Sequence, residues 1–237
     1  MTGHPAAVKH VLKDNFKNYE KGDNFFQLME EFLGVGIFST DGDVWTMHRK
    51  IASHMFSRRM LAEGTKVAVR QSRTLVARLD KVAASADPGA TADLQDLFYR
   101  FTMDVFTEIS FGVELKSLER EGLHPFAASF DAVQEYCMRR LSAPTWKVRR
   151  HLGWLLPGER RFRASVRTMN AFSQQIIGAR RRKANDGSPL GPDLISRFLD
   201  KGSTFAAGKA AGGGFSDKEL RDLVLNFLIA GRDTTAC

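Results

Sequence analysis

The chain has 237 residues, 43% of them hydrophobic, which is enough for one large domain with a buried core and argues against global disorder. Lys and Arg outnumber Asp and Glu by 35 to 27, but the basic runs contain no interleaved aromatic residues and no helix-turn-helix or zinc-finger spacing, so nucleic-acid binding is not expected. The two cysteines, Cys137 and Cys237, give neither a disulfide framework nor a metal-ligand spacing, and no stretch approaches the ~20 apolar residues of a membrane span.

Apolar residues recur with a helical period through nearly the whole chain, and no run of alternating strands interrupts them. The segment 93–110 carries the clearest apolar stripe, and Gly residues or Pro residues mark several of the breaks between segments. The predicted helices cover residues 5–13, 24–33, about 41–55, 60–84, 93–110, 125–141, 159–183, 193–200 and 216 onward. The fold class is therefore predicted to be mainly α, with little or no β-sheet.

The last predicted helix has a distinct start and no stop signal. Residues 202–214 are rich in Gly, Ala, Ser and Lys and predict a flexible surface loop. Ser216 and Glu219 then have the spacing of a capping box, and Phe215 stands where a hydrophobic staple would. Since the helical pattern is still running at Cys237, we expect residues 1–237 to form one partial domain.

The segment Leu228–Thr235 conflicts with local helix propensity. Gly231 in a helix interior costs about 1 kcal/mol relative to Ala, and the Asp-Thr-Thr triplet that follows competes for backbone hydrogen bonds. A glycine allows a flat group to approach the helix, and a Thr hydroxyl beside a carboxylate can hold a water, so the segment suggests a groove with a proton source. The alternative is a helix C-terminus, with Asp-Thr-Thr capping the next element.

The order Ala-Gly-x-Asp-Thr-Thr resembles the signature of the long distal helix of cytochromes P450, over Asn226–Thr235. The resemblance implies that Ala230 and Gly231 line the haem face, that Asp233 is the catalytic acid and that Thr234 is the hydroxyl on the oxygen side. Thr234 rather than Thr235 is predicted for this role, because it lies four residues from Ala230 whereas Thr235 lies five residues away and is turned aside.

A second motif, Trp45 and Arg49 at a spacing of four, resembles the Trp-x-x-x-Arg of the same family. This spacing places an indole N–H and a guanidinium on one helical face, where both donate hydrogen bonds and the guanidinium suits a carboxylate. The resemblance implies that the pair binds a haem propionate; alone, such a pair is a stacked surface pair. We expect Trp45 and Arg49 to face Gly231 and Thr234 across a groove lined by the 24–40 segment.

The resemblance runs from about residue 4 to the last residue, and the residues of its two motifs are typical of the branch that hydroxylates fatty acids in plants, fungi and algae. It implies a haem-dependent monooxygenase that inserts one atom of O2 into an apolar substrate such as a fatty acid. It also implies an electron-donor reductase, with Lys50, Arg58 and Arg59 as its contact surface, and membrane association of the full-length protein at the cytoplasmic face of the endoplasmic reticulum.

The family's haem ligand is a cysteine in a Phe-x-x-Gly-x-x-x-Cys-x-Gly loop, and neither Cys137 nor Cys237 has those neighbours. The residues of this chain are therefore expected to be inactive by themselves, with no metal ligand among them. The alternative function is a non-enzymatic helical interaction module that binds an acidic partner through its basic faces. That alternative leaves Gly231 and the Asp-Thr-Thr triplet unexplained.

Overall fold

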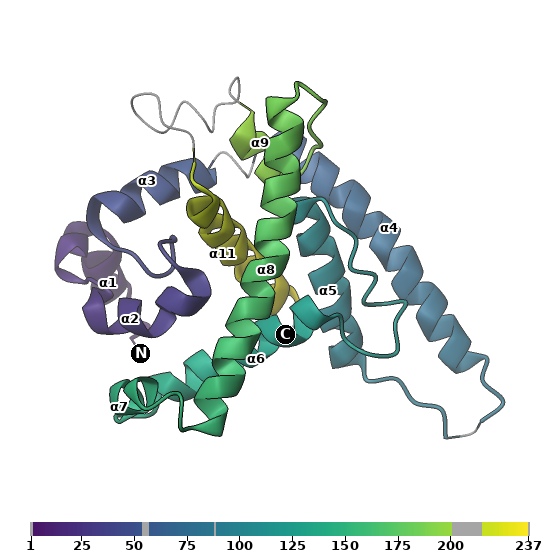
Figure 1. Ribbon diagram of the computed structural model, residues 1–237, viewed down its shortest axis with the longest axis horizontal. Helices are drawn as coiled ribbons and strands as arrows, with labels where there is room; N and C mark the ends of the chain where they lie inside the picture. Colours follow the sequence, from purple (N-terminus) through teal and green to yellow (C-terminus); the bar gives the residue numbers. More distant parts are fainter. Residues whose placement is uncertain (1, 54–56, 88, 201–214, 237) are drawn as a thin grey trace.

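The computed structural model describes residues 2–53, 57–87, 89–200 and 215–236 and contains helices and no strand within these ranges (Figure 1). The mainly α prediction is therefore confirmed, and the loop predicted over 202–214 lies outside the described residues. The elements are α1 Pro5–Lys9, η1 His10–Asp14, η2 Phe16–Asn18, α2 Gly22–Leu33, α3 Gly42–Ser53, α4 Arg58–Ala83, α5 Leu94–Phe111, α6 Pro125–Leu141, α7 Trp146–His151, α8 Pro157–Asn185, α9 Leu194–Leu199 and α11 Asp217–Ala236.

Several of the helices begin at side chains that cap them. Ser57, Asp93 and Asp193 each accept a hydrogen bond from a backbone N–H in the first turn of α4, α5 and α9. The capping box of α11 is confirmed, since the backbone N–H of Ser216 donates to the Glu219 carboxylate (2.8 Å) and the backbone N–H of Glu219 donates to the Ser216 hydroxyl (3.2 Å). Local capping therefore fixes the starts of α4, α5, α9 and α11, whereas α2, α7 and α8 begin without a side-chain cap.

Two segments differ from the sequence prediction. The helix predicted over 5–13 is α-helical only to Lys9 and continues as a π-helical turn, His10–Asp14. The interval between the helices predicted over 125–141 and 159–183 contains the short helix α7, whose Trp146 is buried. Its backbone position is held by tertiary contacts, because the Arg150 guanidinium donates to the Gln27 carbonyl (2.9 Å) and pairs with Glu30 (2.5 Å) of α2.

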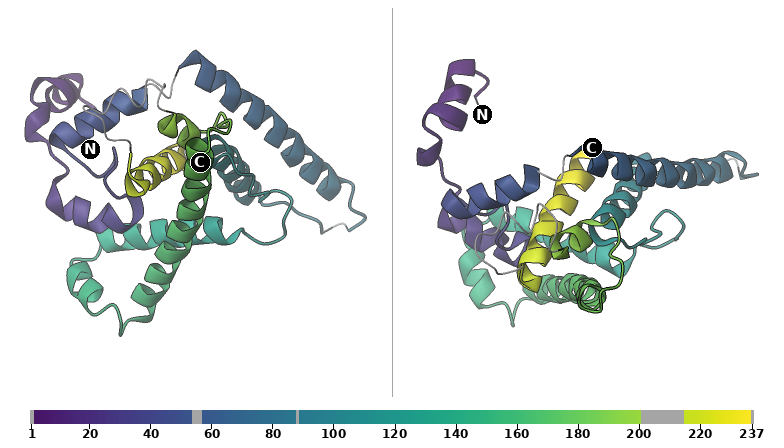
Figure 2. Two further views of the ribbon diagram at one scale, coloured as in Figure 1. Left: turned by 45° about the horizontal axis from the view of Figure 1, so that its top comes forward. Right: turned by 90° about the horizontal axis from the view of Figure 1, so that it is seen from above.

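The helix α11 lies at the centre of the molecule and packs on α5, α8, α2 and α9. Figures 1 and 2 place α3 on one side of it and α4 on the other. Its residues from Leu220 to Asn226 are all buried, whichever way they point. The helix is therefore buried on more than one side, although three of these seven residues, Arg221, Asp222 and Asn226, are polar. A cluster of aromatic rings, including Phe126 stacked on Phe172 (4.3 Å between centroids), fills the adjoining core.

A cluster of buried ion pairs joins α6, α8 and α2. The Arg140 guanidinium of α6 pairs with Glu159 of α8 (2.5 Å) and with Glu31 of α2 (2.8 Å), and the Tyr136 hydroxyl donates to Glu159 (3.0 Å). Because Glu159 is fully buried, removing Arg140 would leave an uncompensated carboxylate in the core, whereas neutralising Glu159 leaves Arg140 paired with Glu31. In the part of the chain described, none of the helices combines the length and the apolarity that crossing a membrane requires.

Candidate functional site

The C-terminal half of α11 forms one wall of a cavity of about 530 Å³. Ala230, Gly231, Thr234 and Thr235 all line it, so the structure brings together the residues that the motif singled out on α11. The opposite walls come from α4, α5 and α9 and are mostly apolar; they include Met60, Leu61, Gly64, Ala68, Phe101, Val105, Phe106, Ile109 and Leu194. The arrangement places a hydroxyl-bearing helix face against a largely apolar hollow.

The Thr234 hydroxyl donates to the carbonyl oxygen of Ala230 at 2.7 Å, one turn earlier in α11. The helix stays continuous to Ala236, so this side-chain bond does not open the backbone ladder. The hydroxyl proton is thus committed to Ala230, and the oxygen lone pairs can accept a hydrogen bond from a water or a ligand. Thr235 lines the same cavity and is not turned away from it, so the Ala230 hydrogen bond is what distinguishes the two hydroxyls.

Gly231 faces the ring of Phe106 on α5. A Cβ atom at this position would lie under 3.0 Å from three carbons of that ring. The sequence prediction explained the missing side chain by the approach of a flat ligand, whereas helix packing against Phe106 already requires it. That Gly231 lines a cofactor stays a prediction. Ala230 and Thr234 are the more direct candidates for that role.

Asp233 points away from this cavity toward α6. Its carboxylate accepts a hydrogen bond from the Gln134 amide and pairs with the Arg232 guanidinium (3.1 Å). Arg232 is buried, pairs with Asp131 of α6 (2.5 Å) and lies over the Tyr99 ring (4.7 Å to the centroid). Burial raises the pKa of the Asp131 carboxyl, and the Arg232 cation acts in the opposite direction.

The motif alone does not predict this cluster, because Arg232 occupies its variable position. The available signal is a charged residue that directly follows the mostly apolar stretch 223–231, where burial demands a partner. Asp233 and Thr234 are neighbours in the chain, but in this structure they belong to different faces of α11. Their cooperation in proton transfer would require the Asp233 side chain to leave Gln134.

The predicted propionate ligands lie on α3, and neither lines the cavity at Ala230, nor does any residue of the 24–40 segment. The Trp45 ring is half-buried against Phe16 (5.1 Å between centroids) and beneath the Lys21 ammonium (5.8 Å to the centroid). Arg49, one turn later, is exposed and forms no ion pair within the described ranges. The expected groove with both motifs on its rim is therefore not formed by these residues alone.

The side chains nevertheless fit parts of a haem. The exposed Arg49 guanidinium, which pairs with no acid among the described residues, suits a carboxylate, and Ala230 with Thr234 offers a small apolar face next to a hydroxyl. Cys137 does not fit the iron: it is buried in α6 with its thiol toward the Leu28 carbonyl (3.8 Å), and burial raises its pKa to about 12. Cys237 lies outside the described residues, within which no cluster of metal-ligating side chains occurs.

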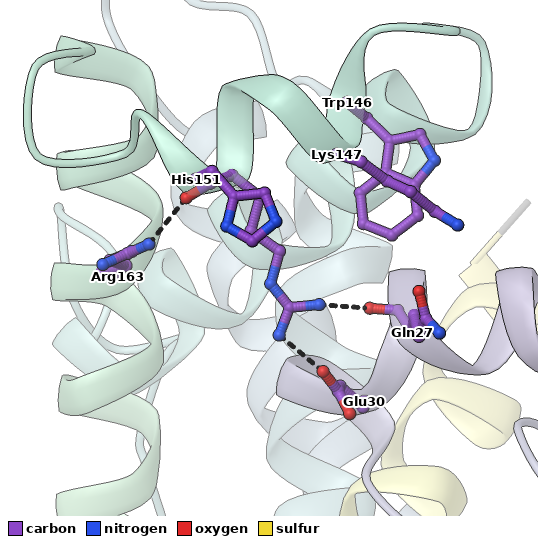
Figure 3. A pocket seen from close by; sticks show the side chains of 7 residues that line it. Gln27, Glu30, Trp146, Lys147, His151 and Arg163 are labelled. Atoms are coloured by element: carbon purple, nitrogen blue, oxygen red, sulfur yellow. Dashed lines mark hydrogen bonds and ion pairs between the residues drawn. The ribbon is translucent and has the colours of Figure 1, made fainter.

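A second hollow, of about 420 Å³, lies between α2, α7 and the start of α8 (Figure 3). Its lining is polar and mostly basic, with Lys147, His151 and Arg163 beside Glu30. Arg163 donates to the Arg150 carbonyl (2.9 Å), and Arg150 is already neutralised by Glu30. These contacts explain how α7 is attached to α2 and α8, and they leave Val148 and Arg149 of α7 exposed.

Comparison with known proteins supports the same family at the levels of sequence and fold. The chain is 37% identical to cytochrome P450 94B1 of Arabidopsis thaliana, over 100% of this chain and 44% of that relative. It is 36% identical to cytochrome P450 CYP94D108 of Paris polyphylla, over 100% of this chain and 45% of that relative. The crystal structure of the cytochrome P450DA heme domain matches 98% of this chain and 47% of its own with a TM-score of 0.77 and 21% identity. The chain thus spans a little under half the length of these proteins. Since the cytochrome P450 family model matches residues 1–237 throughout, the chain belongs to the cytochrome P450 family.

Proposed function

We propose that the protein to which these residues belong is a haem-dependent monooxygenase that inserts one atom of O2 into an apolar substrate, and that this substrate is a fatty acid. Haem, when bound, supplies the activation of oxygen. The observation that carries the proposal is the Thr234 hydroxyl bonded to Ala230 on the open face of α11, beside apolar walls. The apolar lining and the resemblance to the fatty-acid branch support the choice of substrate.

The residues of this chain would bind and position rather than ligate the iron. Arg49, with Trp45, would hold a propionate, because a guanidinium donates two parallel hydrogen bonds to a carboxylate. Thr234 would accept a hydrogen bond from a water, and Asp233 would deliver a proton to that water after exchanging Gln134 for solvent. The electron-donor reductase is proposed to approach the exposed Lys50, Arg58 and Arg59 at the junction of α3 and α4.

The test is a carbon monoxide difference spectrum of the natural full-length protein. A thiolate-ligated haem gives a strongly red-shifted band, which we expect from that protein and not from residues 1–237 reconstituted with haem, since Cys137 is a buried thiol with a raised pKa. Oxygenated fatty acid should then appear when a reductase and O2 are supplied. A full-length protein that binds no haem would refute the enzymatic proposal and leave the interaction module.

Membrane association is proposed through the surface formed by residues 138–167. Every exposed charged side chain in this segment is basic, and its single acid, Glu159, is buried. Its exposed apolar side chains include one that is 70% accessible, Trp154; the others are Met138, Leu141, Val148, Leu152 and Leu155. Apolar side chains framed by cations are typical of a surface that lies in the headgroup region of an anionic bilayer, such as the cytoplasmic leaflet of the endoplasmic reticulum.

Vesicle co-sedimentation tests this part. Replacing Trp154 and Leu155 by Ala should weaken binding to phosphatidylserine vesicles, whereas Val76→Ala, which removes an apolar side chain of α4 about as exposed as Leu155, should not. Binding that is unchanged by the double substitution would exclude this surface as the membrane contact.

A further inference from the structure

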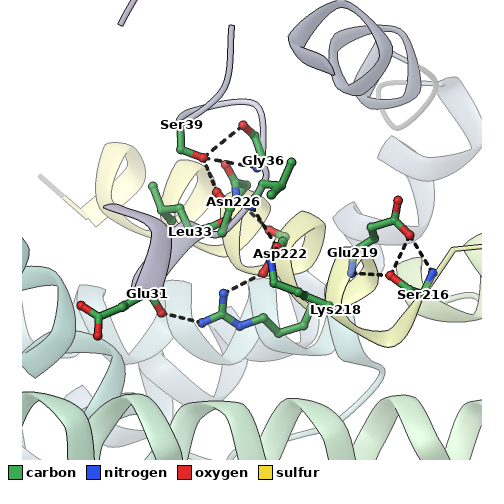
Figure 4. A network of polar contacts seen from close by, with 12 residues as sticks. Glu31, Leu33, Gly36, Ser39, Ser216, Lys218, Glu219, Asp222 and Asn226 are labelled. Carbon is green, nitrogen blue, oxygen red and sulfur yellow. Dashed lines mark hydrogen bonds and ion pairs between the residues drawn. The ribbon is translucent and has the colours of Figure 1, made fainter. Parts of the chain in front are cut away.

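Two buried polar side chains of α11 hold the loop that leads into α3 (Figure 4). The Asp222 carboxylate accepts a hydrogen bond from the backbone N–H of Val35 (2.9 Å). One turn later, the Asn226 amide donates to the Leu33 carbonyl (2.8 Å) and accepts from the backbone N–H of Phe38 (3.1 Å). The loop 34–40 is therefore attached to α11 by its main chain, at both of its ends.

The loop is shaped to receive these side chains. Gly34, with φ of 56°, lies against Asp222, and Gly36 lies against Asn226; a Cβ atom at either glycine would be under 3.0 Å from the facing side chain. The Asp222 charge is balanced by Arg221 (2.7 Å), which also reaches the Glu31 carbonyl through its other nitrogen (2.9 Å). The polar groups of the contact are therefore largely satisfied, although both side chains are almost fully buried.

The position of α3 depends on this loop. Among the described residues, α3 packs on the rest of the molecule over a short face only, with His48 and Ala52 buried, and no other helix lies along its length. The loop instead closes on itself, with the Ser39 hydroxyl donating to the Gly34 carbonyl (2.5 Å), and Asp41 accepts from the backbone N–H of Gly22 (3.0 Å) directly before α3 begins. The contacts that fix the loop therefore help to fix where Trp45 and Arg49 lie, together with the buried His48 and Ala52 of α3.

We propose that Asp222 and Asn226 are positioning residues that set the place of Trp45 and Arg49 relative to the Ala230–Thr234 face, an inference that rests on the proposed haem site. Residues 222, 226, 230 and 234 follow one another at intervals of four, so they form a single stripe on α11 that turns by about 120° from first to last. One helix, α11, therefore holds Ala230 and Thr234 as part of its own chain. It positions Trp45 and Arg49 through the loop that it binds.

The experiment compares Asn226→Ala with Glu159→Gln, which weakens a buried polar contact between α6 and α8 without touching the loop. In the natural full-length protein, Asn226→Ala should speed amide exchange in residues 34–53 while α5 and α8 keep their protection. Transfer of haem to excess apomyoglobin should be about tenfold faster than in Glu159→Gln, the order of effect of removing a residue that holds a ligand in place.

Gly36→Ala gives a second route to the same result, because its methyl group would press on Asn226 from the loop side. It should reproduce the local increase in exchange and the faster haem loss. Exchange that rises evenly across α3, α5 and α8, or haem loss no faster than in Glu159→Gln, would overturn the proposal. If the unsubstituted protein takes up no haem, the proposed function fails, while the exchange measurement still tests the attachment of α3.

Discussion

Replacing Gly231 by Ala separates two explanations for a glycine in the middle of α11. The added methyl group would lie under 3.0 Å from three ring carbons of Phe106, so the ring or the helix must shift. Overpacking of this kind costs about 1–3 kcal/mol, whereas Ala in place of Gly stabilises a helix interior by about 1 kcal/mol. We expect a net loss of about 1 kcal/mol in the free energy of unfolding, which lowers Tm by roughly 2–4 °C for a chain of this size.

The assay is a double-mutant cycle measured by urea unfolding of the haem-free protein. In a Phe106→Ala background the ring is absent, so Gly231→Ala should instead stabilise by about 1 kcal/mol. Gly178→Ala on α8 is the matched control and should stabilise in either background, because a Cβ there meets only the Arg182 side chain at 3.7 Å. If Gly231→Ala acts alike with and without the ring, or is harmful only when haem is bound, packing on Phe106 does not explain the glycine.

Three further outcomes are expected in the natural full-length protein. Thr234→Ala should keep haem bound but divert electrons to hydrogen peroxide, whereas Thr235→Ala should leave product formation coupled to electron consumption; the reverse pattern would exchange their roles. Arg58→Glu with Arg59→Glu should slow reduction by the electron donor at low ionic strength, and an unchanged rate would remove these residues from that surface. Cys137 should resist alkylation until the protein unfolds, and rapid labelling of the folded protein would contradict this. Because the pKa of its thiol is raised from 9.0 to about 12 in the fold, the stability that the neutral thiol contributes should be lost as pH rises from about 9 to about 12.

The helices could be predicted because their signals are local. An apolar period of 3.6 residues, a capping residue and a glycine or proline at the boundary depend only on nearby sequence, and α6 begins and ends at the predicted residues, Pro125–Leu141. The helix α7 could not be found this way. It has six residues, four of them basic, and is held by the contacts of Arg150 with a helix more than a hundred residues earlier in the chain.

The site could be predicted only as far as helical spacing reaches. Intervals of three and four residues place Ala230, Gly231 and Thr234 on one face, and the cavity lining agrees. Spacing does not say which helix packs on that face, so the ring of Phe106 beside Gly231 was not foreseen. Helical spacing also does not show which residue will pair with a charged side chain. The contact of Asp233 with α6 depends on how α11 is rotated about its own axis.

The buried polar residues of α11 explain how that rotation is fixed. A helix surrounded by apolar neighbours gains similar hydrophobic energy at several rotations, because burial of apolar area is not directional. Asp222, Asn226 and Arg232 remove this freedom, since each has its hydrogen-bonding partners in only one orientation and would lose about 1–3 kcal/mol or more in any other. Asp222 and Asn226 bind the loop before α3, and Arg232 binds α6 on the other side of the axis. The rotation that satisfies all three also turns Ala230 and Thr234 toward the cavity, so the polar groups that the core must accommodate are what orient the Ala230–Thr234 face.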